Sequence, residues 1–292
     1  MQKWIFSCFL LLSFGCNSNL EGIDKEQAKN ILRIGHGGLG FASFLPWNPY
    51  PINSMTSLRL ALEKHSADGL EVDVRMTKDK KFVLYHDKDL SSSTLLDSCV
   101  EIYNYEHLVQ VKYALGFPFD LFQEEFILGL EDLIDYLKTF EDFPHLHIDL
   151  RVHSPCFNAE SNYKWEMEIF QSLASFLKQK NVPKEKVIIN TFARDMLSKA
   201  IKADDGFPLS LEVYEKPDEA LDFAMKHRMS YLTIKPELLS KQFSQKARNE
   251  GVKIITFGGN SAKGNLHMIK VEADIIQSNN LEALNDYLMP LK

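Results

Sequence analysis

The chain alternates aliphatic residues with charged ones in two segments, Gly69-Leu-Glu-Val-Asp-Val-Arg75 and His147-Ile-Asp-Leu-Arg151. In a β-strand, residues two apart share a face, so Glu71 and Asp73 project together while the aliphatic residues point the other way. A two-sided surface strand has this pattern, and so does a barrel strand that is covered outside by helices. If Asp149 joins the other two acids at one barrel mouth, the three carboxylates repel unless a cation lies among them.

Short β-rich runs alternate with amphipathic stretches of helical length along most of the chain. The eight strand candidates are Arg33–Gly37, Gly69–Arg75, His145–Arg151, Lys186–Phe192, Pro208–Tyr214, Tyr231–Pro236, Lys253–Gly258 and Ala273–Ser278. The helix candidates between them include Ser54–His65, Tyr163–Lys180, Pro217–His227 and Pro236–Glu250. The pattern predicts a (β/α)8 TIM barrel, with an open doubly wound sheet as the alternative.

One region departs from this alternation. Residues 79–128 read as an insertion after the second strand, and Phe82–His86 looks like an extra strand within it. Two helix starts are marked by an early proline followed by an acid, at Pro217 and at Pro236. We therefore predict one barrel domain over residues 31–292.

The N-terminus has the composition of an export signal. Lys3 precedes an apolar run from Trp4 to Phe14, and Gly15-Cys16 follows. This predicts a signal peptide over residues 1–15 and a bacterial lipoprotein lipidated at Cys16, with residues 16–30 as a tether. The protein would then be exported, to the periplasm or to an outer-membrane anchor. An ordinary cleaved signal peptide is the alternative.

Composition narrows the classes of partner and metal. The net charge of −7 argues against a nucleic-acid binder, which needs a basic stripe. Membrane association is therefore expected only through Cys16. Export permits a disulfide between Cys99 and Cys156, although two isolated cysteines do not establish one. Without a CxxC motif, a zinc cluster is not supported.

Active sites of such barrels lie at the carboxyl ends of the strands. The residues expected there are His36, Glu71, Asp73, Asp149, Arg151, Thr191, Glu212 and Lys235. Three carboxylates make an all-oxygen site that suits one Mg²⁺ or Ca²⁺ ion rather than zinc. The alternative is that these acids form salt bridges with Arg75, Arg151 and Lys235.

Two histidines flank this cluster in the sequence. His36 ends the first strand in Gly35-His-Gly-Gly38, and His86 lies in Tyr85-His-Asp87. Imidazole titrates near neutral pH, so the pair would suit acid–base work on a phosphoester. A lone histidine is more often a structural residue with satisfied hydrogen bonds.

The order of these motifs closely resembles the glycerophosphodiester phosphodiesterases. The segments concerned are His36-Gly-Gly, Gly69-Leu-Glu-Val-Asp-Val-Arg-Met-Thr-Lys-Asp79, Val83-Leu-Tyr-His-Asp87 and His147-Ile-Asp-Leu-Arg151. Softer matches are Asn190-Thr-Phe192, Gly251-Val-Lys-Ile-Ile-Thr256 and Ala273-Asp-Ile-Ile-Gln-Ser278, so the resemblance covers about Ile31 to Leu291.

The resemblance implies a role for each matching residue. In that family the histidines that match His36 and His86 act as acid and base. The acids that match Glu71, Asp73 and Asp149 hold one divalent cation. Arg151 corresponds to a lysine that the family pattern is expected to place near the phosphate.

The sequence also departs from the family pattern. Gly37 stands where the family has the arginine of His-Arg-Gly, and Ile52 stands for the glutamate of Pro-Glu-Asn-Thr. Arginine and glutamate could be partners that were lost together. Asp149 replaces a more usual glutamate, as in the related sphingomyelinase D enzymes. The charge lost near the phosphate is expected to come from Arg151 or Lys235.

These observations predict metal-dependent hydrolysis of a phosphodiester. The substrate is expected to be a small glycerophosphodiester that yields glycerol 3-phosphate and an alcohol, with Arg151, Lys235 and Glu212 binding it. One alternative is a noncatalytic metal- or ligand-binding barrel lipoprotein. Another is a lipid phosphodiesterase of the sphingomyelinase D or phosphatidylinositol-specific phospholipase C kind. The apolar residues Phe119 and Leu121-Phe122 of the insertion could contact lipid or form a satellite core.

Overall fold

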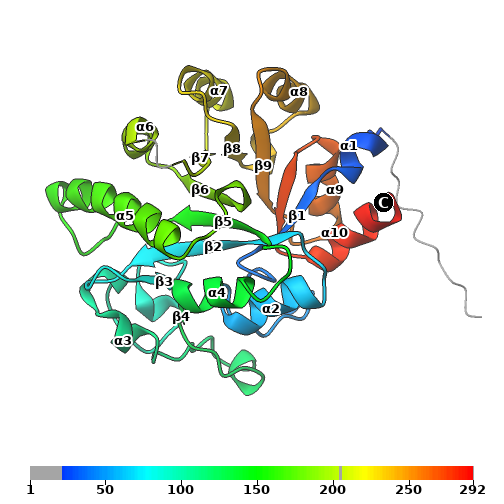
Figure 1. The fold of residues 1–292 in the computed structure, drawn as a ribbon. Helices are drawn as coiled ribbons and strands as arrows, with labels where there is room; N and C mark the ends of the chain where they lie inside the picture. Colours follow the sequence, from blue (N-terminus) through cyan, green and yellow to red (C-terminus); the bar gives the residue numbers. More distant parts are fainter. Residues whose placement is uncertain (1–21, 204–205, 292) are drawn as a thin grey trace, which may run out of the picture.

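A computed structural model describes residues 22–203 and 206–291, and its centre is a closed barrel of eight parallel strands (Figure 1). The strands are β1 (Leu32–His36), β2 (Gly69–Met76), β5 (His145–Leu150), β6 (Val187–Thr191), β7 (Leu209–Val213), β8 (Tyr231–Ile234), β9 (Lys253–Gly258) and β10 (Ile275–Ser278). They follow the order β1-β10-β9-β8-β7-β6-β5-β2, and pairing of β1 with β2 closes the ring. The predicted barrel is confirmed.

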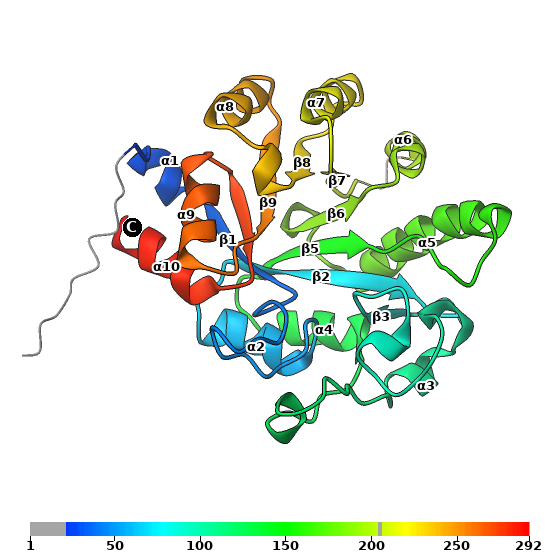
Figure 2. The same ribbon diagram turned by 180° about the vertical axis from the view of Figure 1, so that it is seen from behind.

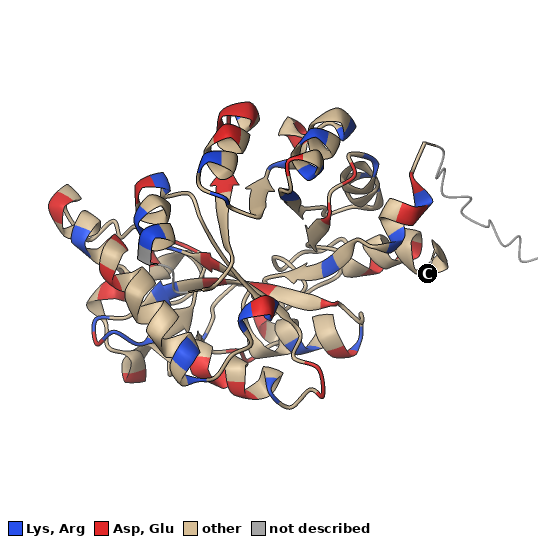
Figure 3. Cartoon of the chain, turned by 45° about the horizontal axis from the view of Figure 1, so that its top comes forward, with Lys and Arg blue, Asp and Glu red and all other residues tan. Residues whose placement is uncertain are grey.

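Helices surround the barrel, as the views from both sides show (Figures 1 and 2). They are α2 (Met55–Glu63), α4 (Leu130–Leu137), α5 (Ala159–Gln179), α6 (Arg194–Ala203), α7 (Pro217–Lys226), α8 (Lys241–Asn249), α9 (Ala262–Lys270) and α10 (Leu281–Leu288). Acidic and basic residues are interspersed along these outer helices (Figure 3).

One predicted helix start is confirmed and the other is wrong. Pro217 occupies the first turn of α7, as expected. Pro236 instead opens a short 3₁₀ turn, Pro236–Leu238. The helix α8 begins only after Ser240, whose hydroxyl accepts a hydrogen bond from the amide of Phe243. A serine cap at this position outweighs the proline signal because it satisfies a free amide of the first turn.

The alternation seen in β2 sorts its side chains between two environments. Leu70, Val72 and Val74 are fully buried in the main core, which also contains apolar residues of the surrounding helices. A separate cluster around Ile34 and Ile255 contains residues from β1, β6, β9 and β10. The charged residues of β2 therefore face the barrel interior, where the functional site is expected.

The folded part of the chain begins before residue 31. A short helix, α1 (Lys25–Lys29), is capped by Asp24 and buries Ala28 in the main core. Gln27 also donates a hydrogen bond to Asp274. The described end of the predicted tether, residues 22–30, thus packs on the barrel, because its short helix has an apolar residue to bury. The predicted signal peptide and Cys16 lie outside the described residues.

The insertion after β2 forms a small structure of its own. Strand β3 (Phe82–Leu84) pairs antiparallel with β2, and β4 (Leu128–Gly129) pairs with β3. Between them lie α3 (Tyr105–Leu108) and three 3₁₀ turns, Leu90–Ser92, Val100–Ile102 and Phe119–Leu121. A second core contains Val83, Tyr85, Leu90, Val100, Leu108, Tyr113 and Ile127.

In the described part of the chain, no helix is long and apolar enough to cross a membrane.

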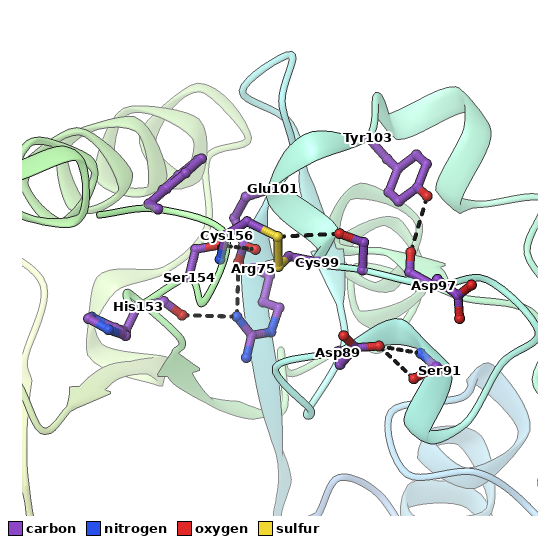
Figure 4. The surroundings of a disulfide bond; sticks show 12 residues. Arg75, Asp89, Ser91, Asp97, Cys99, Glu101, Tyr103, His153, Ser154 and Cys156 are labelled. Carbon is purple, nitrogen blue, oxygen red and sulfur yellow. Dashed lines mark hydrogen bonds and ion pairs between the residues drawn. A yellow bond between two sulfur atoms is a disulfide. The ribbon is translucent and has the colours of Figure 1, made fainter. Parts of the chain in front are cut away.

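A disulfide and an ion pair fasten this insertion to the barrel (Figure 4). Cys99 is bonded to Cys156, which lies beyond the end of β5, and their Cα atoms are 6.2 Å apart. Next to it, Arg75 of β2 pairs with Glu101 of the insertion at 2.9 Å. The sequence left this disulfide open, and the structure contains it.

Candidate active site

Strand register brings the three predicted metal ligands together at the carboxyl ends of the strands. His36 on β1 lies beside Glu71 on β2, and Asp73 lies beside Asp149 on β5. One carboxylate oxygen from each acid lies within 4.8 Å of the others. All three acids are buried. The cluster that sequence alternation predicted therefore exists, and its spacing would let the acids share one ion.

Burial and mutual repulsion disfavour ionisation of two of these acids. Burial raises the pKa of Glu71 well above its usual range, and the charges of Asp73 and Asp149 raise it further. Burial likewise raises the pKa of Asp149 to about 8, against the opposing charge of Arg151. A cation at the centre would reverse this effect by favouring the charged forms.

Asp73 is the exception because more groups stabilise its charge. Burial raises its pKa, but the charges of Arg151 and His86 and hydrogen bonds from Asn53 and Arg151 lower it to about 2. Asn53 holds the carboxylate through its side-chain amide at 2.8 Å, and its own oxygen accepts the backbone amide of Asp73 at 3.1 Å. Asp73 is thus a preorganised anion at the barrel mouth.

The donor set fits a hard divalent cation. It consists of oxygen atoms alone, which Mg²⁺ and Ca²⁺ prefer. Among the buried polar atoms of the described residues, Asp149 Oδ1 has no hydrogen-bond partner, and neither does Glu212 Oε2. Buried oxygens without partners are costly, so a bound ion would offset part of that cost.

Arg151 lies against the acids. Its Nη2 atom is 2.5 Å from Asp73 Oδ1 and 2.8 Å from Asp149 Oδ2, and it is the salt-bridge partner that the sequence offered as an alternative. The other two cations of that alternative have other partners: Arg75 pairs with Glu101, and Lys235 lies over the Tyr214 ring. One arginine thus faces three buried acids, of which only Asp73 has a lowered pKa.

The environment of His36 fixes the orientation of its ring. Its Nδ1 atom lies 2.6 Å from Asn279 Oδ1, and its Nε2 atom lies 3.7 Å from Glu71 Oε2. Because an amide oxygen only accepts hydrogen bonds, this contact places the proton on Nδ1 and leaves Nε2 facing the acids. Burial lowers the pKa of His36, and this outweighs the raising effects of Asp73 and Asn279.

His86 has an acidic neighbour instead. Its Nδ1 atom lies 2.8 Å from Asp87 Oδ1, and Asp87 in turn accepts a hydrogen bond from Ser92. Burial lowers the pKa of His86, but the hydrogen bond to Asp87 and the charge of Asp73 raise it by more. The two imidazoles therefore sit in contrasting surroundings, as an acid–base pair requires.

A cleft of about 810 Å³ opens beside these groups. His86 and Arg151 line it together with two half-exposed aromatic residues, Phe192 and Tyr214. Its volume suits a small molecule, and its charged end adjoins the acidic cluster.

Glu212 and Lys235, predicted to bind substrate, lie near the same cleft. Glu212 is buried on β7 and accepts a hydrogen bond from the hydroxyl of Tyr214. Burial raises its pKa, against that hydrogen bond and the charge of Arg151. The Lys235 ammonium lies 4.6 Å from the centre of the Tyr214 ring. Tyr214 thus links both residues to the cleft wall.

The two departures from the family motif are neighbours in space. Gly37 has φ +53°, and a Cβ atom placed on it would lie 1.9 Å from Cγ1 of Ile52. Its backbone amide donates to Glu71 Oε2 at 2.9 Å. Ile52 thus fills the space that a side chain at residue 37 would enter, so the two substitutions are coupled.

Sequence reasoning missed three polar residues at this site, Asn53, Asp87 and Asn279. Each contacts a predicted ligand or histidine, and Asp87 also lines the cleft. Asn279 follows the last strand directly, so the rule that found the other strand-end residues could have found it. Asn53 stands at the asparagine of the family's Pro-Glu-Asn-Thr motif, and Asp87 directly follows His86.

The chain is similar to a known protein family and to solved structures of the same fold. The model of the glycerophosphoryl diester phosphodiesterase family matches residues 46–283. The chain belongs to that family. A phosphodiesterase of Oleispira antarctica in complex with the product sn-glycerol-3-phosphate has the same fold, with a TM-score of 0.72, 20% identity and coverage of 87% of this chain and 95% of that one.

One further solved structure has a similar fold, and one further protein is similar over part of the sequence. A glycerophosphodiester phosphodiesterase structure from Parabacteroides distasonis has a TM-score of 0.70, 18% identity and coverage of 89% and 98% of the two chains. A glycerophosphodiester phosphodiesterase of Bacillus altitudinis is 41% identical over 59 residues. That match spans 20% of this chain and only 24% of the relative's length.

Proposed function

We propose that this protein hydrolyses a glycerophosphodiester to glycerol 3-phosphate and an alcohol, using one divalent cation. The observation that carries the proposal is the gathering of Glu71, Asp73 and Asp149 within 4.8 Å, next to His36 and beside the cleft that His86 lines. Membership of the family and the glycerol phosphate held by the Oleispira antarctica relative support the choice of substrate.

The three acids would hold Mg²⁺ or Ca²⁺. When bound, such an ion supplies Lewis-acid stabilisation of charge that develops on the phosphate. Among the chain's own residues, Asn53 keeps Asp73 in place, and the amide of Gly37 holds Glu71.

The histidines would move the protons of the reaction. One accepts a proton from the attacking oxygen, which is water or a neighbouring hydroxyl of the substrate. The bond between phosphorus and the alcohol oxygen then breaks, and the other histidine protonates the departing alkoxide. Where a substrate hydroxyl attacks, a cyclic phosphate forms first, and water then adds to its phosphorus and opens the ring to glycerol 3-phosphate. Asn279 and Asp87 orient the two rings for this work.

Substrate binding is assigned to Arg151, Lys235 and Glu212. Arg151 is already at the charged end of the cleft, where its guanidinium can attract a phosphate. The aromatic walls Phe192 and Tyr214 would contact the alcohol part of the substrate.

A phosphodiester panel tests the proposal. Glycerophosphocholine, glycerophosphoethanolamine and lysophospholipids are assayed with and without chelator, and the released glycerol 3-phosphate is measured. We expect activity on a glycerophosphodiester that chelation abolishes and that added Mg²⁺ or Ca²⁺ restores. The variant Asp149→Asn should lose this activity. Glu168 is an exposed acid on α5, and Glu168→Gln serves as the matched control that should keep the activity. Activity indifferent to chelation would remove the metal from the proposal.

A noncatalytic binding role is the second candidate. It is favoured by one observation: Ile52 occupies the space beside Gly37, where the family carries an arginine. Cation-dependent binding of a glycerophosphodiester by calorimetry, without product after prolonged incubation, would select this candidate.

Export as a lipoprotein remains part of the proposal. The disulfide between Cys99 and Cys156 supports it, because such bonds persist mainly in oxidising compartments. Metabolic labelling with a radioactive fatty acid tests it, and Cys16→Ala should abolish incorporation. Incorporation that survives this substitution would contradict lipidation at Cys16.

A further inference from the structure

Two loops at the mouth of the barrel expose large apolar side chains. One follows β1 (residues 40–50) and the other belongs to the insertion (residues 115–122), so both lie at the face that holds the active site. We name their exposed apolar residues the aromatic rim: Phe44, Leu45, Trp47, Phe117, Leu121 and Phe122. Leu45 is 91% exposed and Phe117 is 86% exposed. A gathered apolar surface of this kind marks an interaction site.

Ring contacts join the two loops into one surface. Phe119, half-buried between them, lies 5.0 Å from the Phe44 ring and stacks on Trp47 at 5.7 Å. Trp47 also meets the edge of Phe122 at 5.3 Å. The aromatic rim is therefore contiguous, although its parts are about seventy residues apart in the chain.

Hydrogen bonds hold the insertion loop in this shape. Both oxygens of Asp120 are used, since they accept the backbone amides of Leu115 and Gly116 and the side-chain amide of Gln123, each at 2.9 Å. Farther along, Glu125 accepts hydrogen bonds from Thr56 of α2. The polar groups of the loop are turned to its own backbone, and its apolar groups face outward.

The charge of the rim selects the kind of partner. Residues 41–50 contain no Lys, Arg, Asp or Glu, and residues 115–122 contain only Asp120, whose oxygens are already engaged. A nucleic acid or an acidic protein would require basic residues here. Trp and Phe side chains that project from a surface with little charge favour the interface between lipid headgroups and acyl chains.

We propose that the aromatic rim docks on the surface of a phospholipid bilayer. Phe41 connects the rim to the active site, because its ring meets the edge of His86 with centroids 5.1 Å apart. Docking would therefore turn the catalytic cleft toward the membrane surface, where phosphodiesters derived from lipids occur. It requires neither the cation nor turnover, so it stands apart from the proposed function.

Fluorescence of Trp47 tests the docking without interference from a lipid anchor. The full-length chain carries Trp4→Phe, which leaves Trp47 and the buried Trp165 as its tryptophans. It is mixed with phosphatidylcholine vesicles, either plain or brominated on the acyl chains. We expect a blue shift of Trp47 with plain vesicles and quenching with brominated ones. Vesicle binding alone is not the readout, since the N-terminal apolar run could produce it.

Variants locate the effect on the rim. A triple variant in the same background carries Leu45→Ser, Phe117→Ser and Leu121→Ser. It should lower the quenching about tenfold, because three exposed apolar side chains no longer transfer into lipid. Met225→Ser, at a half-exposed position on α7, is the matched control and should keep the quenching. Circular dichroism checks that each variant is folded.

Three outcomes would overturn the proposal. Trp47 could stay unquenched in the full-length chain, or the triple variant could be quenched equally. The third is a homodimer, seen by sedimentation in the absence of lipid, that the triple variant dissociates while Trp47 remains unquenched. That result would assign the rim to a second copy of the chain.

Discussion

Arg75 on β2 and Arg151, directly after β5, line the same cleft, but their surroundings differ. Arg75 is 2% exposed and pairs with one acid, Glu101, at 2.9 Å. The other oxygen of Glu101 accepts the hydroxyl of Ser154 at 2.8 Å (Figure 4). One cation thus meets one anion, and both carboxylate oxygens of Glu101 are satisfied by the protein.

Arg151 faces an excess of acids. It contacts Asp73 and Asp149 directly, and the charge of Glu212 also acts on it. Glu71 adds a fourth acid to the same mouth, and two oxygens in this group have no partner. A balanced buried pair fastens the insertion, whereas an unbalanced cluster leaves a place for a cation. The first ion pair fastens the insertion to the barrel, and the second lies within the candidate active site.

The largest effect should come from removing either histidine beside the unbalanced cluster. His36→Ala or His86→Ala should lower kcat by about 10²–10⁴-fold, because each loses a proton-transfer group. The thermal midpoint should change little, since neither ring belongs to the Arg75 network. Steady-state assays with calorimetry check both points, and near-normal turnover by both variants would refute the assigned roles.

Glu101→Ala should break the balanced pair and lower the free energy of unfolding by about 3–5 kcal/mol, because Arg75 is left as an unpaired buried charge. Denaturant titration measures the loss. Glu168→Gln, which removes an exposed ion pair with Lys80, should cost less than about 1 kcal/mol. An equal, small cost for both variants would contradict the distinction between the two arginines.

Added cation should stabilise the unbalanced cluster. At about 100 times its dissociation constant, Mg²⁺ or Ca²⁺ should raise the free energy of unfolding by about 2.7 kcal/mol, since only the folded chain gathers the three acids. Asp149→Asn should abolish this gain, and Glu168→Gln should keep it. Thermal scans at several cation concentrations measure the effect. Equal stabilisation of Asp149→Asn would place the ion elsewhere.

Positions 37 and 52, where the chain departs from the family motif, can be changed together to the family residues. This adds an arginine at the mouth of the barrel. Gly37→Arg alone should destabilise the fold by about 1–3 kcal/mol, because its side chain meets Ile52. Ile52→Glu in the same chain should recover part of that loss. A double-mutant cycle measures the coupling. Strictly additive costs would show that the two positions are independent.

The effect that is smallest at neutral pH concerns His147, which lies two residues before Asp149 on β5. Burial lowers its pKa to about 3, so the folded state keeps the ring neutral. Below pH 6.5 the unfolded chain takes up a proton at His147 and the folded chain does not, so the unfolded state gains stability. The contribution of the neutral ring to folding is therefore complete above pH 6.5 and is lost as pH falls toward 3. The slope is at most about 1.4 kcal/mol per pH unit. His147→Met should remove this part of the acid sensitivity, and identical pH profiles would contradict the assignment.

Sequence reasoning identified the strand-end residues because alternation in a strand is local. Glu71 and Asp73 had to share a face wherever β2 lay, and the predicted segment matches the observed strand closely. Sequence reasoning failed where a neighbouring group outweighed a local sequence signal. Ser240 moved the start of α8 away from Pro236, and packing of Ala28 made a helix of the expected tether.

The sequence by itself determined the barrel, the family motifs and the identity of the acids and histidines, because periodicity and residue type are fixed along the chain. Only the tertiary structure decided that Arg151 contacts two of the acids, that Ile52 fills the space beside Gly37, and that two distant loops share one rim. These are contacts between side chains far apart in sequence. Their distances depend on barrel closure and loop packing, which no local pattern encodes.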